Sequence, residues 1–268
     1  MEAINTQRED FKQLGKLYEP HANVEVHVDQ INGVTSHWFI PAGKQDGPIA
    51  IYLHGGGYIM GGIESHKNML THIAAYLNIR MLFVEYRLAP EFPYPYGVED
   101  AVAVYEQLLS NGEELFIIGD SAGGGLTIAA IKRMAAKNLP LPKAAILLSP
   151  WIYLEANTSS YNVNQHNDPV LNQQGIKAYA DLYRGSRTLV DVSYNDHSLQ
   201  QFPPVLILVG SGEILLDDSR NFHASISSIQ PDSVLSVHNG ATHVWLLTDV
   251  HSFHAKFALA EIKAFLGL

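Results

Sequence analysis

Five short apolar runs that do not alternate with polar residues restrict the folds open to this chain of 268 residues. Successive side chains of a strand point to opposite faces of its sheet. An unbroken apolar run is therefore typical of a strand buried on both faces, as in parallel sheets. Helical patterns separate the runs, and strands alternating with helices predict an α/β sheet with right-handed crossovers. The runs cover 49–53, 81–84, 115–118, 144–148 and 205–209.

The rest of the chain extends this pattern. Alternating valines over 24–28, the hairpin dipeptide Asn32-Gly33 and a second apolar stretch ending at Pro41 predict an antiparallel addition to the sheet. Before them, three apolar residues recur at helical spacing and predict a short amphipathic helix: Phe11, Leu14 and Leu17. The other expected helices are 66–76, 98–109, 124–137, 217–228 and 252–265, with a last strand at 234–237.

The six residues Gly-Asp-Ser-Ala-Gly-Gly at 119–124 stand between an expected strand and an expected helix. Strand, Gly-x-Ser-x-Gly and helix in that order are typical of a nucleophile elbow, a sharp turn that exposes a serine hydroxyl. Gly119 and Gly123 allow the backbone to bend and pack closely. The N–H of Ala122 then points to a helix start, where an oxyanion is favoured. A flexible Gly-Ser loop is the structural alternative, but the flanking elements favour the elbow, with Ser121 as the nucleophile.

Three consecutive glycines follow the strand 49–53, in His-Gly-Gly-Gly-Tyr at 54–58. Such a loop exposes backbone N–H groups that suit an anion, either a phosphate or an oxyanion. A dinucleotide-binding loop requires a glycine where Met60 stands, and a Walker A loop requires a Gly-Lys-Ser/Thr sequence that does not follow. An oxyanion loop fits, because an HGGG-type loop supplies an oxyanion donor in lipases and esterases. A flexible loop is again the structural alternative.

A serine nucleophile needs a general base, and the chain offers 13 histidines. On α/β-hydrolase folds the order is serine, then acid, then histidine, so the base is expected after the last strand. His243 lies there, before the closing helix. His238 ends the strand and is expected to point elsewhere, whereas His251 and His254 fit a solvated face of the closing helix. No His-Glu-x-x-His sequence indicates a zinc site.

The acid is expected after the penultimate strand, where three carboxylates compete. Glu213 comes first, in the turn that leaves the strand. Asp217 and Asp218 come next, where capping and first-turn charge on the following helix explain them without catalysis. Position therefore favours Glu213, with Asp217 as the alternative. The acid would fix the imidazole tautomer and stabilise the imidazolium.

Bulk composition restricts the partners and the compartment. The formal charge of −10 argues against nucleic acid and anionic membranes as partners. The chain contains no cysteine, which excludes disulfides, thiolate metal sites and a cysteine nucleophile. The first sixteen residues are polar without a hydrophobic region, and no apolar run approaches the ~18 residues of a membrane span. We expect a cytoplasmic protein that needs neither a cofactor nor a metal.

The stretch between the strands 144–148 and 205–209 is unusually long and rich in aromatic residues. A long excursion of this kind is more often a lid or a pocket wall than a plain crossover. We therefore expect a single domain over 1–268, with a short N-terminal segment 1–23 and an insertion 151–200 that forms a cap. Five aromatic residues are candidates for the pocket, although each could equally be core: Tyr58, Trp151, Tyr153, Tyr183 and Trp245.

Together these motifs resemble the bacterial hormone-sensitive-lipase-like esterases, a group of α/β-hydrolases. The resemblance covers the chain from about residue 24 to the end, and many pieces occur in the right order and spacing. The matching pieces are His-Gly-Gly-Gly-Tyr at 54–58, Tyr-Arg-Leu-Ala-Pro-Glu at 86–91, Gly-Asp-Ser-Ala-Gly-Gly at 119–124, Ser-Pro-Trp at 149–151, Asp-Pro at 168–169, Pro-Pro at 203–204 and the run 213–218.

The resemblance implies an α/β-hydrolase fold: a mostly parallel central sheet with helices on both faces and a small cap. It implies hydrolysis of short-chain carboxylic esters, with Ser121 as nucleophile and His243 as base. Glu213 stands where the family often has the aspartate of an Asp-Pro-Leu-x-Asp motif, and members with this variant use glutamate as the acid. The oxyanion donors would be the backbone N–H groups of Gly56, Gly57 and Ala122, and His54 would support the glycine loop.

Two other functions fit the same scaffold. An amide or formamide hydrolase of the arylformamidase type would use the same triad. A non-enzymatic small-molecule receptor, like the plant gibberellin receptor, lacks the histidine, which is in place here. The resemblance also suggests a homodimer, formed through an edge strand near Val234.

Overall fold

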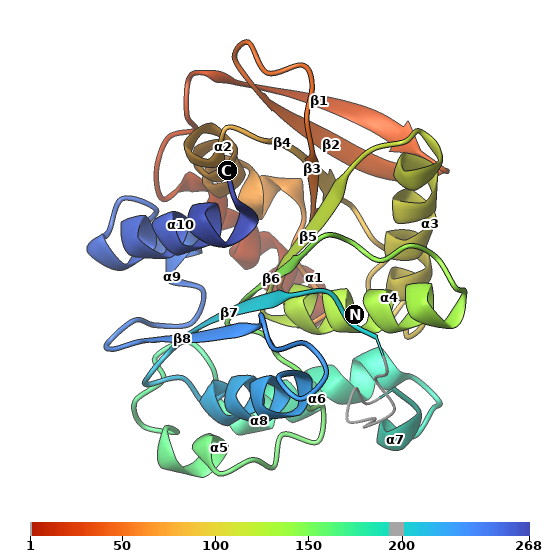
Figure 1. Ribbon diagram of the computed structural model, residues 1–268. Coiled ribbons are helices and arrows are strands. Elements are labelled where there is room, and N and C mark those ends of the chain that lie inside the picture. The colour runs from red at the N-terminus through yellow and green to blue at the C-terminus, as the bar shows by residue number, and fades with distance from the viewer. Residues whose placement is uncertain (1, 193–200) are drawn as a thin grey trace.

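Every residue of β3 (Ile49–Leu53) and of β5 (Leu115–Asp120) is buried, as their unbroken apolar runs predict. The computed structural model describes residues 2–192 and 201–268 and puts both strands at the centre of an eight-stranded sheet (Figure 1). Residues 193–200, the end of the expected insertion, lie outside the described residues. In spatial order the strands are β1 (Val24–Ile31), β2 (Val34–Pro41), β4 (Arg80–Val84), β3, β5, β6 (Ala145–Leu148), β7 (Val205–Gly210) and β8 (Val234–His238).

Six of these strands pair in parallel, and only β2 runs in the opposite direction to the rest. The parallel order runs from β4 through β3, β5, β6 and β7 to β8, which forms one edge of the sheet. β1 and β2 form a hairpin that joins β4 in antiparallel orientation, so the predicted antiparallel addition is confirmed. Asn32 and Gly33 make its turn with φ values of 49° and 80°, the left-handed conformation that two-residue hairpin turns favour.

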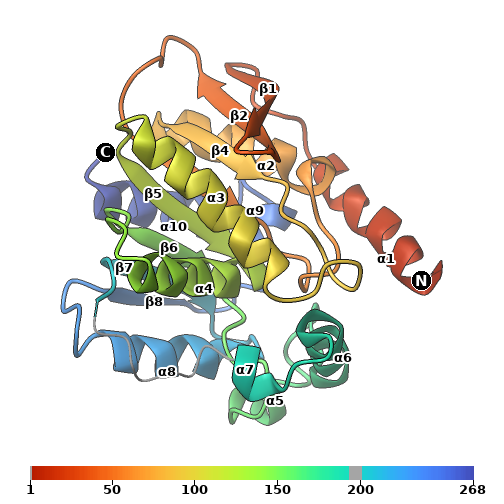
Figure 2. The ribbon, with the colours of Figure 1, turned by 90° about the vertical axis from the view of Figure 1, so that its right-hand side faces the viewer.

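Helices cover both faces of the sheet (Figure 2). α3 (Tyr96–Ser110), α4 (Ala122–Ala136) and α8 (Leu216–Ile226) pack on one face, and α2 (Ile63–Leu77) and α10 (Phe253–Leu266) on the other. Successive side chains of a strand belong to the hydrophobic cores on opposite faces of the sheet. In β5, Leu115 and Ile117 belong to the core under α3, α4 and α8. Phe116 and Ile118 belong to the core under α2 and α10. The predicted helices are all present, with ends that differ by a few residues.

The N-terminal helix differs most from its prediction. α1 (Glu2–Lys12) starts well before the expected stripe and gives way to a short 3₁₀ helix, η1 (Gln13–Lys16). Phe11 and Leu14 pack against the core, but Leu17 is 53% exposed, so its assignment to the apolar stripe was wrong. The cause is the change to 3₁₀ geometry, because three residues per turn break the α-helical spacing.

The segment 151–192 leaves the sheet between β6 and β7. It carries α5 (Ser160–Val163), α6 (Gln173–Arg184) and α7 (Leu189–Val192), and a further short helix, α9 (Trp245–Thr248), follows β8. Figure 2 shows α1 and α6 on the same side of the sheet. Within the described ranges, no helix is both long and apolar enough to cross a bilayer.

Candidate active site

Ser121 occupies a sharp turn between β5 and α4. Its backbone has φ 51° and ψ −120°, a strained conformation that residues other than glycine rarely adopt. The two neighbouring glycines are required by close packing. A Cβ on Gly119 would lie 2.3 Å from the carbonyl oxygen of Gly123, and one on Gly123 would lie 2.0 Å from that of Leu53. The local sequence therefore dictates the elbow, and packing on β3 holds it.

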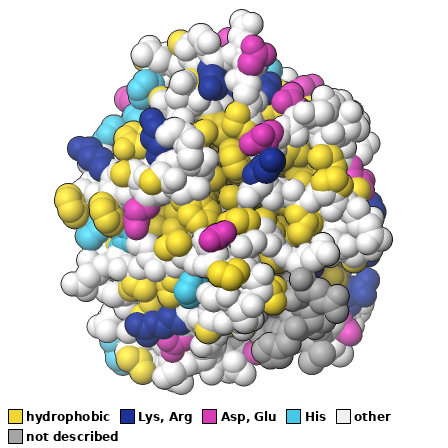
Figure 3. Space-filling model, viewed as in Figure 1, with side chains coloured by type: hydrophobic (Ala, Val, Ile, Leu, Met, Phe, Trp, Pro, Cys, Tyr) yellow, Lys and Arg dark blue, Asp and Glu magenta, His cyan; other side chains and the backbone are white. Residues whose placement is uncertain are grey.

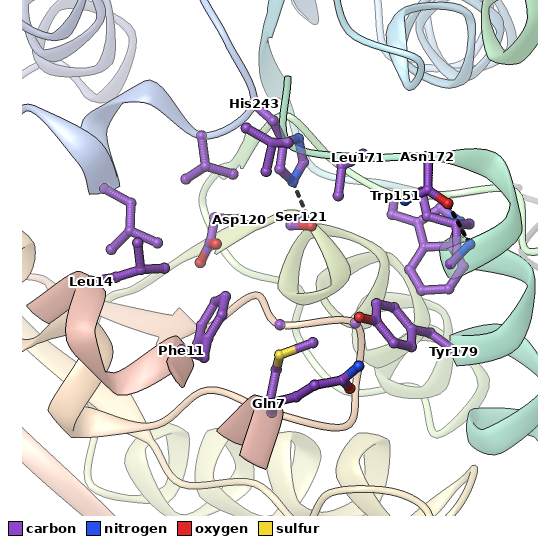
Figure 4. A pocket seen from close by; sticks show the side chains of 18 of the residues that line it. Gln7, Phe11, Leu14, Asp120, Ser121, Trp151, Leu171, Asn172, Tyr179 and His243 are labelled. Carbon is purple, nitrogen blue, oxygen red and sulfur yellow. Dashed lines mark hydrogen bonds between the residues drawn. The ribbon is translucent and has the colours of Figure 1, made fainter. Parts of the chain in front are cut away.

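The turn brings the Ser121 hydroxyl to His243, which lies on the loop between β8 and α9. Its Oγ is 2.9 Å from His243 Nε2 (Figure 4). On the other side of the ring, His243 Nδ1 is 2.8 Å from Oε2 of Glu213. All three side chains are at least nine-tenths buried. His238, which the sequence analysis set aside, pairs instead with Glu261, at 2.8 Å from Nε2. The three residues expected to form a triad are thus adjacent in space.

Glu213 is held by two donors on its other oxygen. Its Oε1 accepts the Gly210 N–H at 2.5 Å and the Ser149 hydroxyl at 2.7 Å. The Ser149 oxygen in turn accepts the N–H of Val244, the residue after His243, at 3.1 Å. Ser149 therefore connects the loops that carry the acid and the base. Sequence reasoning gave it no role, although it belongs to the Ser-Pro-Trp motif.

The competing carboxylates face away from His243. Asp217 accepts the Ser160 N–H at 2.9 Å and pairs with Arg220 at 3.2 Å. Asp218 is fully buried beneath the start of the 151–192 segment and accepts hydrogen bonds from two backbone N–H groups and two hydroxyls. The donors are Ile152, Tyr153, Thr158 and Tyr161. Both aspartates hold this segment against α8.

The electrostatics of the site favour a basic imidazole. Burial lowers the pKa of His243, but the hydrogen bond to Glu213 and the charge of that carboxylate outweigh burial and raise it above the ordinary value. Asp168 adds to this effect from the 151–192 segment. Its carboxylate accepts the N–H of Ile214, beside the acid, at 3.0 Å. A raised pKa makes the imidazole a stronger base.

The glycine loop is fastened to the elbow by the carboxylate of Asp120. Its Oδ1 accepts the Gly55 N–H at 2.9 Å and the Tyr52 hydroxyl at 2.7 Å. Burial raises the pKa of Asp120, but the charge of nearby His66 and the hydrogen bonds outweigh it and leave this pKa below its usual value. Asp120 therefore stays ionised and joins the nucleophile turn to the loop.

His54 lies beneath the loop and does not reach Ser121. Its Nδ1 is 2.7 Å from the carbonyl oxygen of Gly55, and its ring stacks on Tyr86 with centroids 4.3 Å apart. Burial lowers the pKa of His54 to about 3, so the ring stays neutral. Its position fits the support role that the resemblance implies.

The loop leaves backbone donors available. Gly56 and Gly57 have φ values of 112° and 62°, and both line the same cavity as Ser121. Across residues 2–192 and 201–268, no protein acceptor takes the N–H of Gly56, Gly57 or Ala122. Three unpaired donors beside a nucleophile can stabilise a developing oxyanion.

A cavity of about 490 Å³ opens above Ser121. α1 supplies one wall, α6 and the preceding loop the opposite wall, and α9 a third (Figure 4). Trp151 is the one pocket candidate that lines it. The side chains of these walls are Gln7, Asp10, Phe11, Leu14, Met60, Trp151, Val170, Leu171, Asn172, Ile176, Tyr179, Val244, Leu247 and Thr248.

The other four pocket candidates lie outside this cavity, so the prediction for them was wrong. Tyr58 is buried and stacks on Tyr183 with centroids 3.7 Å apart, because the residue after the glycines turns away from Ser121. Trp245 packs on His238 with centroids 4.6 Å apart, and Tyr153 lies half-buried beside Asp218. The sequence analysis did not predict the α6 wall, although a pattern indicates it: residues 172, 175, 176 and 179 recur at helical spacing and lie on one face at the start of α6.

Metal-binding geometry is absent from the part of the chain that the structure describes: no group of three or more His, Asp or Glu side chains could hold an ion there.

Comparisons with known proteins identify the fold and the family. A family profile of the α/β-hydrolase fold matches residues 50–247. An acetyl-hydrolase of Streptomyces hygroscopicus is 36% identical over 72% of this chain and 66% of its own length. An esterase of Acinetobacter venetianus is 30% identical over 98% of this chain and 88% of its own. The chain thus spans just under two thirds of the first relative and most of the second.

Solved structures are similar over nearly the whole chain. An esterase from the bacterial hormone-sensitive lipase family superimposes with a TM-score of 0.94, at 35% identity, over 98% of this chain and 90% of that one. The protein EstE5, in a crystal soaked with p-nitrophenyl butyrate, gives a TM-score of 0.92 at 33% identity with the same coverage. The expected fold and the resemblance noted in the sequence are confirmed.

Proposed function

Because this chain belongs to the bacterial hormone-sensitive-lipase-like esterases of the α/β-hydrolase fold, we propose that it hydrolyses short-chain carboxylic esters through a Ser121-His243-Glu213 triad and an acyl-enzyme. One observation carries the proposal: His243 lies within hydrogen-bond distance of Ser121 on one ring nitrogen and of Glu213 on the other. Nucleophile, base and orienting acid in this chain of contacts are the signature of an activated serine.

The proposed reaction has two steps. Ser121 Oγ attacks the ester carbonyl while His243 Nε2 takes its proton, and the carbonyl oxygen becomes an oxyanion. The N–H groups of Gly56, Gly57 and Ala122 stabilise that charge, and losing one such donor typically costs ~10²–10³ in rate. His243 then protonates the leaving alcohol. A water molecule attacks the acyl-enzyme in the same way and releases the acid.

The cavity supports a small substrate. About 490 Å³ is within the range of ordinary small-ligand pockets, and most of the lining is apolar. We propose that α1 and the insertion 151–200 together form the cap over Ser121, with residues 193–200 outside the described part. A cytoplasmic location, and the exclusion of nucleic acid, stay predictions of the sequence.

The test is hydrolysis of p-nitrophenyl acetate, butyrate and octanoate by the wild type and by Ser121→Ala. We expect activity on the two shorter esters and its loss in the variant. Glu213→Gln should also lose most activity, whereas Asp217→Asn should retain it. Equal activity of wild type and Ser121→Ala would refute the mechanism. Faster cleavage of p-nitroacetanilide than of the acetate ester would favour an amide hydrolase instead.

We also propose a homodimer formed through β8. The strand is a sheet edge, and its Val234 and Val237 are about two-fifths exposed. On neighbouring α10, Phe253 and Phe257 are 78% and 52% exposed, and Figure 3 shows hydrophobic side chains at that end of the helix. An exposed edge with apolar neighbours is a template for pairing. Light scattering should give twice the chain mass, and Val237→Lys should give a monomer.

A further inference from the structure

The wall built by α6 presents one helical face to the cavity. Asn172, Gly175, Ile176 and Tyr179 line it, and their spacing of three and four residues puts them on one side of the helix. The carbonyl oxygen of the Asn172 side chain is already engaged, because it accepts the Gly175 N–H at 2.8 Å to cap the helix. Gly175 and Ile176 offer no polar side chain. Tyr179 is therefore the member of this face that can bring a hydroxyl to a ligand.

Tyr179 lies directly against the glycine loop. A Cβ built on Gly57 would be 2.6 Å from Cδ2 of the Tyr179 ring, so the ring covers the backbone that carries a proposed oxyanion donor. Figure 4 shows the phenol oxygen pointing into the cavity, on the side opposite Phe11 and Leu14. The hydroxyl thus faces the space that a substrate of Ser121 would fill.

This hydroxyl is free to act as a donor. In the described part of the chain it makes no hydrogen bond, whereas the other hydroxyl on the cavity wall, Thr248, donates to the carbonyl of Trp245 at 3.0 Å. Burial raises the pKa of Tyr179, so the phenol keeps its proton at neutral pH. Gln7 and Asp10 are the remaining polar side chains outside the triad region, and both lie at exposed positions of α1.

We propose that the Tyr179 hydroxyl donates a hydrogen bond to a second oxygen of the bound ester, so that the site selects short esters with an acceptor oxygen close to the scissile bond. This inference rests on the proposed esterase function. The predicted substrate is a short ester whose acceptor oxygen faces α6 and whose apolar part faces the opposite wall, where Phe11 and Leu14 lie. The oxygen can belong to the acyl or to the alcohol part, and the experiment separates the two.

The experiment compares wild type and Tyr179→Phe on two pairs of esters of equal length. The acyl pair is p-nitrophenyl butyrate and p-nitrophenyl methoxyacetate, and the alcohol pair is butyl acetate and 2-methoxyethyl acetate. For each pair, the readout is the kcat/KM of the oxygen-bearing ester divided by that of the other ester. Comparing this preference between the variant and the wild type cancels the intrinsic reactivity of the esters. We expect the preference for the oxygen-bearing ester to fall by about 3- to 10-fold in one pair, the usual worth of a neutral hydrogen bond.

Tyr76→Phe is the matched control, since Tyr76 is exposed on α2, away from the cavity, and should leave both ratios unchanged. Ratios that are equal in wild type and Tyr179→Phe for both pairs would overturn the inference, including the case in which all four esters slow down together. A wild type that hydrolyses none of the esters would overturn the proposed function and the inference with it. Activity with unchanged ratios overturns the inference alone.

Discussion

Ser149 donates its hydroxyl hydrogen to Oε1 of Glu213 across 2.7 Å, while Oε2 of the same carboxylate lies against His243. Hydrogen bonds to a charged acceptor contribute more than neutral ones, about 1.5–3 kcal/mol. Ser149→Ala removes this anchor and also leaves the Val244 N–H without its acceptor. We expect kcat to fall by roughly 10- to 100-fold with little change in KM, measured by steady-state kinetics.

Ser211 provides the matched control for this prediction. Its hydroxyl also bridges the acid and base loops, since it donates to Asn239 and accepts the Gly240 N–H, but it does not touch Glu213. Ser211→Ala should keep kcat close to the wild-type value. A Ser149→Ala variant with wild-type kcat would show that Gly210 alone suffices to hold the carboxylate.

Activity should depend on the protonation of His243. Only the neutral imidazole can accept the proton of Ser121, so kcat/KM falls as the pH drops through the pKa of His243. Because Glu213 raises that pKa, the midpoint should lie above about 6.5, the ordinary histidine value. Glu213→Gln removes the charge and should shift the midpoint of the residual activity to lower pH.

The control for the pH profile is Glu261→Gln, which changes a carboxylate paired with another histidine, His238, outside the cavity. Its midpoint should match that of the wild type. If Glu213→Gln has an unshifted midpoint, the acid limb of the profile belongs to a group other than His243.

Asp218 should make the folded protein less stable as the pH rises from the acid range to neutrality. Burial raises the pKa of Asp218 from 3.8 to about 7. Between these two values the folded protein holds a proton that the unfolded chain releases, so the free energy of unfolding falls with rising pH, by at most about 1.4 kcal/mol per pH unit. Urea unfolding of Asp218→Asn from pH 5 to pH 8 should lack this component of the slope.

Tyr161→Phe is the control for Asp218, because it removes one donor to the carboxylate but leaves the titrating group. It should retain the slope that Asp218→Asn loses. Identical slopes for wild type and Asp218→Asn would contradict the assignment.

Arg8 fastens the α1 wall of the cavity. Its guanidinium donates to the carbonyls of Ile59 and Ala89, at 2.7 and 3.0 Å, and pairs bidentately with Glu91 at 2.8 Å. α1 has no buried residue of its own, so this fork is a main attachment. Arg8→Ala should raise KM for p-nitrophenyl butyrate by about 3- to 10-fold and change kcat less. Lys12→Ala, on the same helix, removes two solvent-exposed ion pairs, one to Glu9 within α1 and one to Glu64 of α2, and should leave KM unchanged because exposed pairs contribute little.

The sequence predicts the sheet well because each buried strand is marked by a local apolar run. Ser121, Glu213 and His243 lie far apart in the chain but within hydrogen-bond distance in the structure, and the elbow motif together with chain order selected them. β3 covers the same residues as the apolar run 49–53, because all five side chains of this strand are buried. His243 follows from chain order and from its loop. Walls made by distant segments are harder to predict: Arg8 and Glu91 are 83 residues apart, and nothing in the local pattern joins them. The prediction that Tyr58 lines the pocket was wrong for a related reason. The left-handed backbone conformation of Tyr58 decides which way its ring points, and the sequence does not reveal it.

Asp120 has a mechanical consequence. One carboxylate joins the glycine loop to the nucleophile turn, and that turn packs against the end of β3, so we expect the floor of the site to behave as a single rigid unit. The walls come from α1 and α6, two elements at the periphery of the sheet. Deformation during turnover should therefore be confined to these walls, and variation among relatives can reshape the chamber without disturbing the chemistry beneath it.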